Sequence, residues 1–234
     1  MQALDLYALI EEHLDFEEEV HHLYKTIGHT VLSKDPKTLI DIGCGQGEFC
    51  HIMQLNGIKS FGVDLSAKQV EIAVSKGTNA QCIDIKDIDE KFDCATAVFD
   101  VINYISPSYI EEFFKHCYNL LEQNGHFIFD INSLYGFDTV AQGTLNIDLE
   151  DKFIAIDANF KENILYTDIT LFHQKDTKQR YKKDTGTIEQ YCYSNEELTS
   201  FLNKVGFSVE KIIDINLHTD EQFDKHIFVC KKGK

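Results

Sequence analysis

The chain has 234 residues, 43% of them hydrophobic and 26% charged, which is the composition of a globular protein rather than a disordered one. Its length suits one α/β domain with a small appended lid. Acidic residues outnumber Lys and Arg by 39 to 22, for a formal net charge of -17. Since clustered basic side chains supply most of the affinity for a phosphate backbone, this balance excludes DNA and structured RNA as expected substrates.

The seven cysteines contain no CxxC pair and no repeating framework, which favours reduced thiols in a cytoplasmic protein. No basic segment followed by an apolar stretch opens the sequence, so we expect no signal peptide. No apolar run has the length that a bilayer requires. We therefore expect a cytoplasmic protein, monomeric or homodimeric, whose partner is a small molecule rather than a membrane or a nucleic acid.

The first half of the chain alternates between two apolar patterns. Residues 1–33 are acidic, with apolar side chains at helical spacing, and predict an N-terminal helical cap. Ser66 is expected to cap a later helix with Gln69 as its capping-box partner, and Pro107 to take the first position of another. The expected strands are 38–42, 58–64, 80–84, 94–99 and 125–131, and the expected helices are 47–55, one beginning after Ser66, and 106–121.

The alternation stops after Ile131. The segments 153–160, 164–172 and 179–193 alternate polar and apolar residues without intervening helices, as antiparallel hairpins do. Ser194 and Glu197 predict a capping box for a helix that ends near Lys204, followed by strands at 207–215 and 227–231. The predicted fold is a Rossmann-like, doubly wound α/β sheet, mostly parallel with an antiparallel last strand.

Three parts follow from this pattern. Residues 34–135 and 194–234 form the expected core, residues 1–33 the helical cap, and residues 145–193 an antiparallel β lid. Open α/β sheets bind ligands at the carboxyl ends of their strands. Because the insertion comes just after such an end, we expect it to cover the substrate site.

The strongest local signal is Asp41-Ile-Gly43-Cys44-Gly45-Gln-Gly47, which directly follows a strand and opens a helix. Glycines let the backbone turn sharply and approach a ligand, and the helix N-terminus behind them offers unpaired N–H groups. Asp64 ends the second strand, where a carboxylate can accept both hydroxyls of a ribose. This combination predicts a nucleoside-containing cofactor without saying which one.

The same residues resemble the class I S-adenosylmethionine-dependent methyltransferases, in particular small-molecule enzymes of the amino-sugar type that carry an antiparallel lid. Residues 39–47 resemble the first motif of that superfamily, with GxGxG spacing, and Phe61 to Ser66 the second. Cys82 to Ile85 resemble the third, and Phe92 to Tyr104 the fourth. The lid departs from the pattern, because Gly186 to Tyr193 keeps only Gln190 and Tyr193 of the motif that those relatives carry there.

The resemblance implies S-adenosylmethionine as cofactor, S-adenosylhomocysteine as product, and no metal. By its motifs Asp41, Cys44 and the loop glycines would hold the methionine portion, together with the Phe99 backbone. Asp64 would bind the ribose and Leu65 would pack on the adenine, whose edge Asp84 and Ile85 would read. The implied cofactor-binding set is Asp41, Gly43, Cys44, Gly45, Gly47, Asp64, Leu65, Asp84, Ile85 and Phe99.

Methyl transfer from a sulfonium needs alignment, dryness and, for a hydroxyl or ammonium acceptor, a base. Asp100 is the first candidate for that base and His173 the second. The catalytic candidates are Asp100, Asn103, Tyr104 and His173, and the candidates for acceptor contacts are Asn132, Tyr166, Tyr181, Gln190 and Tyr193. An alternative is that Asp100, Asp130 and Asn132 hold Mg²⁺, since oxygen ligands suit that ion.

The sequence leaves other functions open. A nicotinamide-dependent oxidoreductase shares the Rossmann-like core, although it prefers GxGxxG and a hydride-site pair that is not recognisable here. A regulatory protein that binds the cofactor without transferring the methyl group is a second alternative. An amino-directed DNA methyltransferase is opposed by charge and by Asp100-Val-Ile-Asn103, which stands where those enzymes carry an Asn/Asp-Pro-Pro-aromatic signature.

Overall fold

The computed structural model describes residues 3–14, 16–174, 180–218 and 221–233. Its larger sheet has seven strands in the order β10-β11-β5-β4-β1-β2-β3. The parallel strands are β1 (Thr38–Ile42), β2 (Lys59–Asp64), β3 (Ala80–Cys82), β4 (Phe92–Ala97) and β5 (Leu121–Asn132). β11 (Lys225–Lys232) runs antiparallel to both β5 and β10 (Phe207–Ile215). The predicted Rossmann-like sheet with an antiparallel last strand is confirmed.

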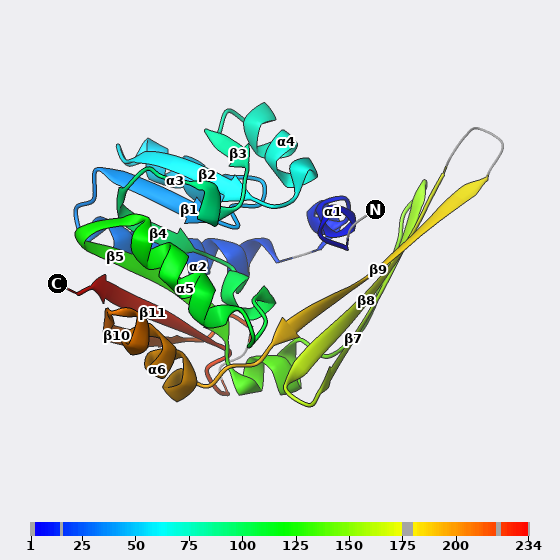
Figure 1. Ribbon diagram of the computed structural model, residues 1–234. Helices are drawn as coiled ribbons and strands as arrows, with labels where there is room; N and C mark the ends of the chain where they lie inside the picture. The colour runs from blue at the N-terminus through cyan, green and yellow to red at the C-terminus, as the bar shows by residue number, and fades with distance from the viewer. Residues whose placement is uncertain (1–2, 15, 175–179, 219–220, 234) are drawn as a thin grey trace.

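Helices cover both faces of this sheet, as Figure 1 shows. On one face a buried cluster joins the sheet to α5 (Ile110–Asn119) and α6 (Asn195–Val205). On the other face a second cluster joins it to α2 (Glu17–Leu32) and α3 (Glu48–Leu55). α4 (Ala67–Ser75) lies beside β2 and β3. The parallel strands therefore end together at one edge, which is where loops can meet a ligand.

The lid is a separate four-stranded antiparallel sheet of order β6-β7-β8-β9 that projects from the core (Figure 1). Its strands are β6 (Gly143–Asp148), β7 (Lys152–Lys161), β8 (Ile164–Gln174) and β9 (Tyr181–Tyr191). β6 was not recognised from the sequence, because nearly all of its residues are exposed and lack an apolar stripe. Gln179, the predicted start of the last lid strand, lies outside the described residues.

The N-terminal cap is broken rather than continuous. α1 (Ala3–Ala8) is followed by a 3₁₀ turn, η1 (Glu11–His13), before α2 begins at Glu17. Leu6 and Ile10 are buried in a third apolar cluster with Ile154, Ile169 and other residues of the lid. The break lets the first segment leave the core and lie between α4 and the lid (Figure 1).

Two predicted helix starts behave differently. The Ser194 hydroxyl accepts a hydrogen bond from the Glu197 N–H, and the Glu197 carboxylate accepts one from the Ser194 N–H, so the predicted capping box at α6 is confirmed. The helix expected at Pro107 instead begins at Ile110, after a turn in which Tyr109 and Ile110 both donate to the Ser106 carbonyl. Within the described ranges, no helix is long and apolar enough to cross a membrane.

Candidate functional site

The glycine loop lies between β1 and α3 with Gly43, Gly45 and Gly47 at φ of 68°, 52° and 80°, a left-handed conformation that favours glycine. A Cβ on Gly43 would stand 2.7 Å from the Val101 side chain, so this position must stay bare. A Cβ on Gly45 would meet nothing within 4 Å. The loop therefore presents open space at Gly45, where a ligand can approach the backbone.

Two carboxylates lie beside this loop. Asp64 accepts hydrogen bonds from the N–H groups of Gly45 (3.0 Å) and Ser66 (2.8 Å), which ties the end of β2 to the glycine turn. Asp41 is fully buried and accepts from the Thr96 hydroxyl at 2.7 Å. Burial raises the pKa of Asp41 to about 7, and the nearby Asp64 charge adds to the rise. Asp41 is thus poised to ionise when a cation arrives.

Of the other predicted cofactor residues, Cys44 lies in the glycine loop, and those expected around the adenine follow β2 and β3. Cys44 is buried, with its side chain against Gly62 of β2 and its thiol 3.7 Å from the Gly45 carbonyl. Near the end of β3, Asp84 caps the 3₁₀ turn Ile85–Asp87 and pairs with the Lys86 ammonium at 3.0 Å. Leu65 is 66% exposed and Ile85 is buried, so Leu65 has an open apolar surface on which a flat ring could pack.

The N-terminal segment closes over the glycine loop, which sequence reasoning missed. Glu11 accepts from the side-chain amides of Gln46 (3.1 Å) in that loop and Gln69 (2.9 Å) on α4. Asp5 accepts from the hydroxyl of Ser66 at 2.7 Å. Gln69 therefore bonds Glu11 and does not return the capping-box bond predicted to Ser66. In two of these pairs the residues are more than fifty positions apart, and in the third they lie on different elements. No local sequence pattern therefore indicates these contacts.

At the end of β4 the chain takes an unusual turn. Phe99 and Asp100 both adopt left-handed φ values, 69° and 54°, which are uncommon for residues with a side chain. The Asp130 carboxylate accepts both of their N–H groups, at 2.6 and 3.0 Å. Such strain persists only where neighbours enforce it, and it clusters at functional sites. Asp130 therefore holds the turn that positions Asp100.

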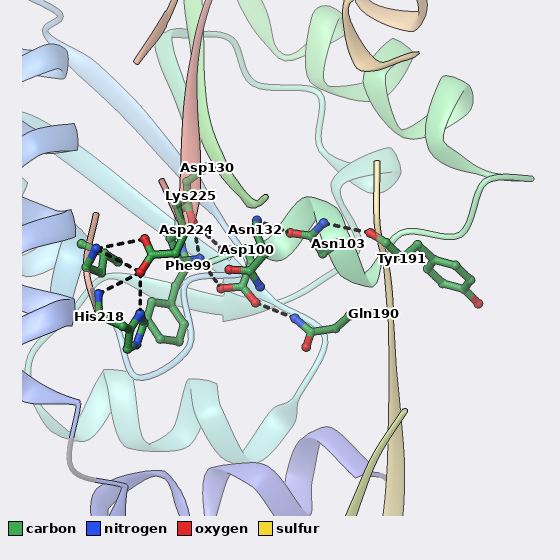
Figure 2. A network of polar contacts seen from close by, with 11 residues as sticks. Phe99, Asp100, Asn103, Asp130, Asn132, Gln190, Tyr191, His218, Asp224 and Lys225 are labelled. Atoms are coloured by element: carbon green, nitrogen blue, oxygen red, sulfur yellow. Dashed lines mark hydrogen bonds and ion pairs between the residues drawn. The ribbon is translucent and has the colours of Figure 1, made fainter. Parts of the chain in front are cut away.

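Lys225, at the start of β11, completes this cluster (Figure 2). Its ammonium lies 2.8 Å from Asp100 and 2.9 Å from Asp130. The preceding residue, Asp224, accepts from the N–H groups of Leu217 and His218 and pairs with the His218 ring, which anchors the start of the strand. Because Lys225 supplies the positive charge between the two carboxylates, the Mg²⁺ alternative for Asp100, Asp130 and Asn132 is corrected.

The lid reaches the cluster through Gln190. Its amide donates to the Asp100 carboxylate at 2.5 Å. Asn103 is fully buried and bonds backbone on both sides, donating to the Tyr191 carbonyl at 2.8 Å and accepting from the Asn132 N–H at 3.0 Å. Asn103 thus joins the core to the lid rather than facing a reactant. Asn132 contacts Asn103 through its backbone N–H. The catalytic prediction for Asn103 is corrected.

Two hydroxyls face the same region. Within the described part of the chain, neither Tyr7 of α1 nor Tyr104 of the 3₁₀ turn Val101–Tyr104 has a hydrogen-bond partner for its phenol. Burial raises the pKa of both phenols, and the nearby charges of Asp100 and Glu11 add to the rise. They remain neutral donors at physiological pH. Tyr7 was not among the predicted site residues.

Several lid residues do not enter the site. His173 pairs with Asp184 at 3.0 Å, opposite Lys182, and eight positions along β9 separate Lys182 from Gln190. At ~3.3 Å per residue that is roughly 26 Å, so the prediction of His173 as a base is corrected. Tyr181 lies at the same far end and is 51% exposed.

Tyr166 and Tyr193 are corrected for other reasons. Leu165 is the residue paired with Gln190, and successive side chains of a strand point to opposite faces. Tyr166 therefore lies on the lid face away from Asp100. Tyr193 is buried in the core cluster and donates its hydroxyl to the Ile105 carbonyl, so it packs the lid exit against the core.

Comparisons with known proteins agree with this geometry. Residues 16–212 match the family model described as methyltransferase domain. A protein of Geobacillus sp. (strain WCH70), named provisionally as a methyltransferase, is 26% identical over 211 residues, covering 84% of this chain and 85% of that protein. The match favours a methyltransferase over the nicotinamide-dependent alternative.

Two solved structures share the fold. An S-adenosylmethionine-dependent methyltransferase from Clostridium acetobutylicum ATCC 824 superposes with a TM-score of 0.77 at 24% identity, over 97% of this chain and 96% of that one. The sugar N-methyltransferase KedS8 from Streptoalloteichus sp. ATCC 53650 superposes with a TM-score of 0.73 at 16% identity, over 100% and 94%. The likeness spans the core and the lid together.

Proposed function

Because the chain belongs to the class I S-adenosylmethionine-dependent methyltransferases, we propose that it transfers the methyl group of that cofactor to a nitrogen or oxygen of a small polar metabolite. The observation that carries the proposal is the meeting of three elements beside the glycine loop. The strand-four turn brings Asp100, the lid brings Gln190, and the N-terminal segment brings Tyr7. Segments from three parts of the chain that meet at one place can exclude water from a bound acceptor.

The residues present fit the cofactor. Gly45 offers open space for close approach, and Asp64 has carboxylate lone pairs beyond those used by Gly45 and Ser66 for a ribose diol. Buried Asp41 suits the cofactor's ammonium, because a nearby cation favours the ionised carboxyl. When bound, the cofactor supplies an electrophilic methyl group on a sulfonium. The protein itself must then align and desolvate the acceptor.

On the acceptor side, the two unpartnered phenols of Tyr7 and Tyr104 can donate hydrogen bonds to polar groups of the substrate. Asp100 has one bond on each oxygen, from Lys225 and from Gln190. A carboxylate has about four lone-pair sites, so Asp100 can still accept from an acceptor N–H or O–H. In this proposal it orients that group and receives its proton as the methyl is transferred.

A small, polar acceptor fits the charge. The net charge of -17 disfavours polyanionic substrates such as nucleic acids. KedS8, which shares the fold, is a sugar N-methyltransferase. We extend only the class of small polar acceptor to this chain.

The test is a calorimetric titration with S-adenosylmethionine, S-adenosylhomocysteine and NAD⁺, followed by transfer of a labelled methyl group to a panel of amines, amino sugars and alcohols. Micromolar binding of the two adenosyl ligands and labelling of one acceptor class are expected. Binding of NAD⁺ alone would overturn the cofactor. Tight adenosyl binding with no transfer to any acceptor would favour the regulatory alternative.

A further inference from the structure

Lys225 is a buried cation whose ammonium contacts other residues of the protein. It is only 3% exposed, donates to Asp100 at 2.8 Å and Asp130 at 2.9 Å, and lies 5.3 Å from the centre of the Phe99 ring. Two of the three N–H groups of the ammonium are donated to carboxylates, and the Phe99 ring lies over the same ammonium. Because Lys225 is also buried, its effect on the reaction passes through the residues that it holds.

Without this cation the two carboxylates could not both stay ionised. Asp100 and Asp130 are buried side by side, and like charges in such a site favour uptake of a proton by one of them. Burial lowers the pKa of Lys225, but the two carboxylates raise it by more, so the ammonium stays charged. The cluster Asp100, Asp130 and Lys225 then has a net charge of -1, from two carboxylates and one ammonium.

Each carboxylate uses its ionised form for a specific bond. Asp130 holds the N–H groups of Phe99 and Asp100 and so maintains the left-handed turn. Asp100 receives the lid amide of Gln190 on the oxygen that does not face Lys225 (Figure 2). A continuous series of contacts thus runs from β11 through Asp100 to β9.

We propose that Lys225 is a positioning residue, which holds Asp100 in the orientation that faces the acceptor and secures the lid through Gln190. The orientation toward the acceptor rests on the proposed function, whereas the hold on the lid does not. Two further titratable groups lie near Asp100: Tyr7 of α1 and Tyr104 of the adjacent turn, whose phenol pKa values its charge raises. Glu11 of η1 acts on both phenols, and Asp64 of β2 acts on Tyr104. None of these groups is a cation, so none can replace Lys225.

The test measures hydrogen–deuterium exchange of the full-length chain without any ligand, so its outcome does not depend on the cofactor or the acceptor. Peptides covering residues 186–191 report the lid strand, and peptides covering residues 38–42 report the core. Lys225→Met is compared with Lys232→Met, which removes a lysine at the other end of β11 that bonds the Tyr118 and Leu121 carbonyls. Exchange is followed from about pH 5 to pH 8 and corrected for its intrinsic pH dependence.

We expect Lys225→Met to raise exchange of residues 186–191 by about tenfold or more, as loss of a hydrogen bond to a charged group implies, with little change in residues 38–42. Loss of lid protection on acidification should also begin at a higher pH than in the parent protein, because the paired carboxylates lose their cation. Lys232→Met should leave both the lid exchange and its pH profile unchanged. Equal exchange in the two variants, or a uniform rise without a pH displacement, would overturn the proposal.

Removal of a buried charge partner can prevent folding, so a second variant preserves the charge of the cluster. In Lys225→Met/Asp130→Asn only Asp100 remains charged, which keeps the net charge at -1. Its lid exchange should exceed that of Asp130→Asn alone, because Asp100 still lacks its cation. Identical exchange in those two variants would assign lid closure to Asp130 and refute the role of Lys225.

Discussion

The buried carboxyl of Asp41 should make cofactor binding depend on pH. It is 2% exposed, bonds Thr96 at 2.7 Å and has a pKa raised to about 7 by burial. In the proposed site it neighbours the ammonium of the cofactor's amino-acid end. A cation at that distance favours the ionised form, so binding should expel the proton that Asp41 holds in the free protein.

The magnitude follows from the raised pKa of Asp41. Below about pH 7 the free protein holds the proton, and releasing it costs binding free energy. If the bound carboxyl is fully ionised, affinity for S-adenosylhomocysteine should rise roughly eightfold between about pH 6 and about pH 7.5, which is about 1.3 kcal/mol. Near pH 7 the complex should release about half a proton as it forms.

Calorimetry in buffers of different ionisation enthalpy measures both quantities at once. Asp41→Asn is the matched control, since an asparagine oxygen can still accept from Thr96 but cannot titrate. The variant should bind more weakly at about pH 7.5 and show no proton release. A parent protein whose affinity is constant from pH 6 to 7.5 without proton release would refute the placement of Asp41 beside the ammonium.

Three further outcomes follow from the same contacts. Asp64→Ala should weaken S-adenosylhomocysteine binding at least about tenfold by calorimetry, through loss of bonds to a charged group, and unchanged affinity would remove the ribose assignment. Asn103→Ala leaves the Asn132 N–H and the Tyr191 carbonyl unpaired, so chemical denaturation should show a loss of about 2–4 kcal/mol; no loss would contradict its linking role. Tyr104→Phe removes a hydroxyl without a partner in the described chain, so the melting temperature should hold while methyl transfer to the identified acceptor falls; unchanged transfer would place the phenol outside the acceptor site.

The parallel core and the glycine loop could be predicted because their signals are local. Asp41, Gly43 and Asp64 lie at the ends of two successive strands, and the topology of a βαβ unit brings such ends to one edge. The two residues of the α6 capping box likewise lie within four positions of the sequence. The same spacing at Ser66 and Gln69 gives only half of a capping box, because the Gln69 amide bonds Glu11 of the N-terminal segment.

The lid contacts could not be predicted because they depend on register. Tyr166 and Gln190 lie on opposite faces only because Leu165 pairs with Gln190, and a one-residue slip would reverse this. The β7–β8 connection is a two-residue turn at Glu162 and Asn163, both left-handed, which fixes its register locally. The sequence offers no comparable signal for the register between β8 and β9, so the facing residues follow only from the structure.

Lys225 was missed for a related reason. Lys225 precedes the strand predicted at 227–231, where a lysine normally lies in solvent, and its partners stand 125 and 95 positions earlier in the chain. The available signal was the pair of carboxylates Asp100 and Asp130 at the ends of two predicted strands, which the sequence analysis considered as ligands of Mg²⁺. Two buried carboxylates at adjacent ends require either a cation or a shared proton.

The distribution of charge across the site indicates different roles for its two pairs of carboxylates. In the proposed site Asp41 and Asp64 line the cofactor end, and neither pairs with a cation among the described residues, whereas Asp100 and Asp130 share Lys225. A cofactor that carries a sulfonium and an ammonium is attracted to the first pair, whose charge it can neutralise. Together with Lys225, the second pair has a net charge of -1, and its geometry is fixed before any ligand binds. Preorganisation of this kind lowers the cost of aligning an acceptor, which is the main demand of a displacement at an activated methyl group.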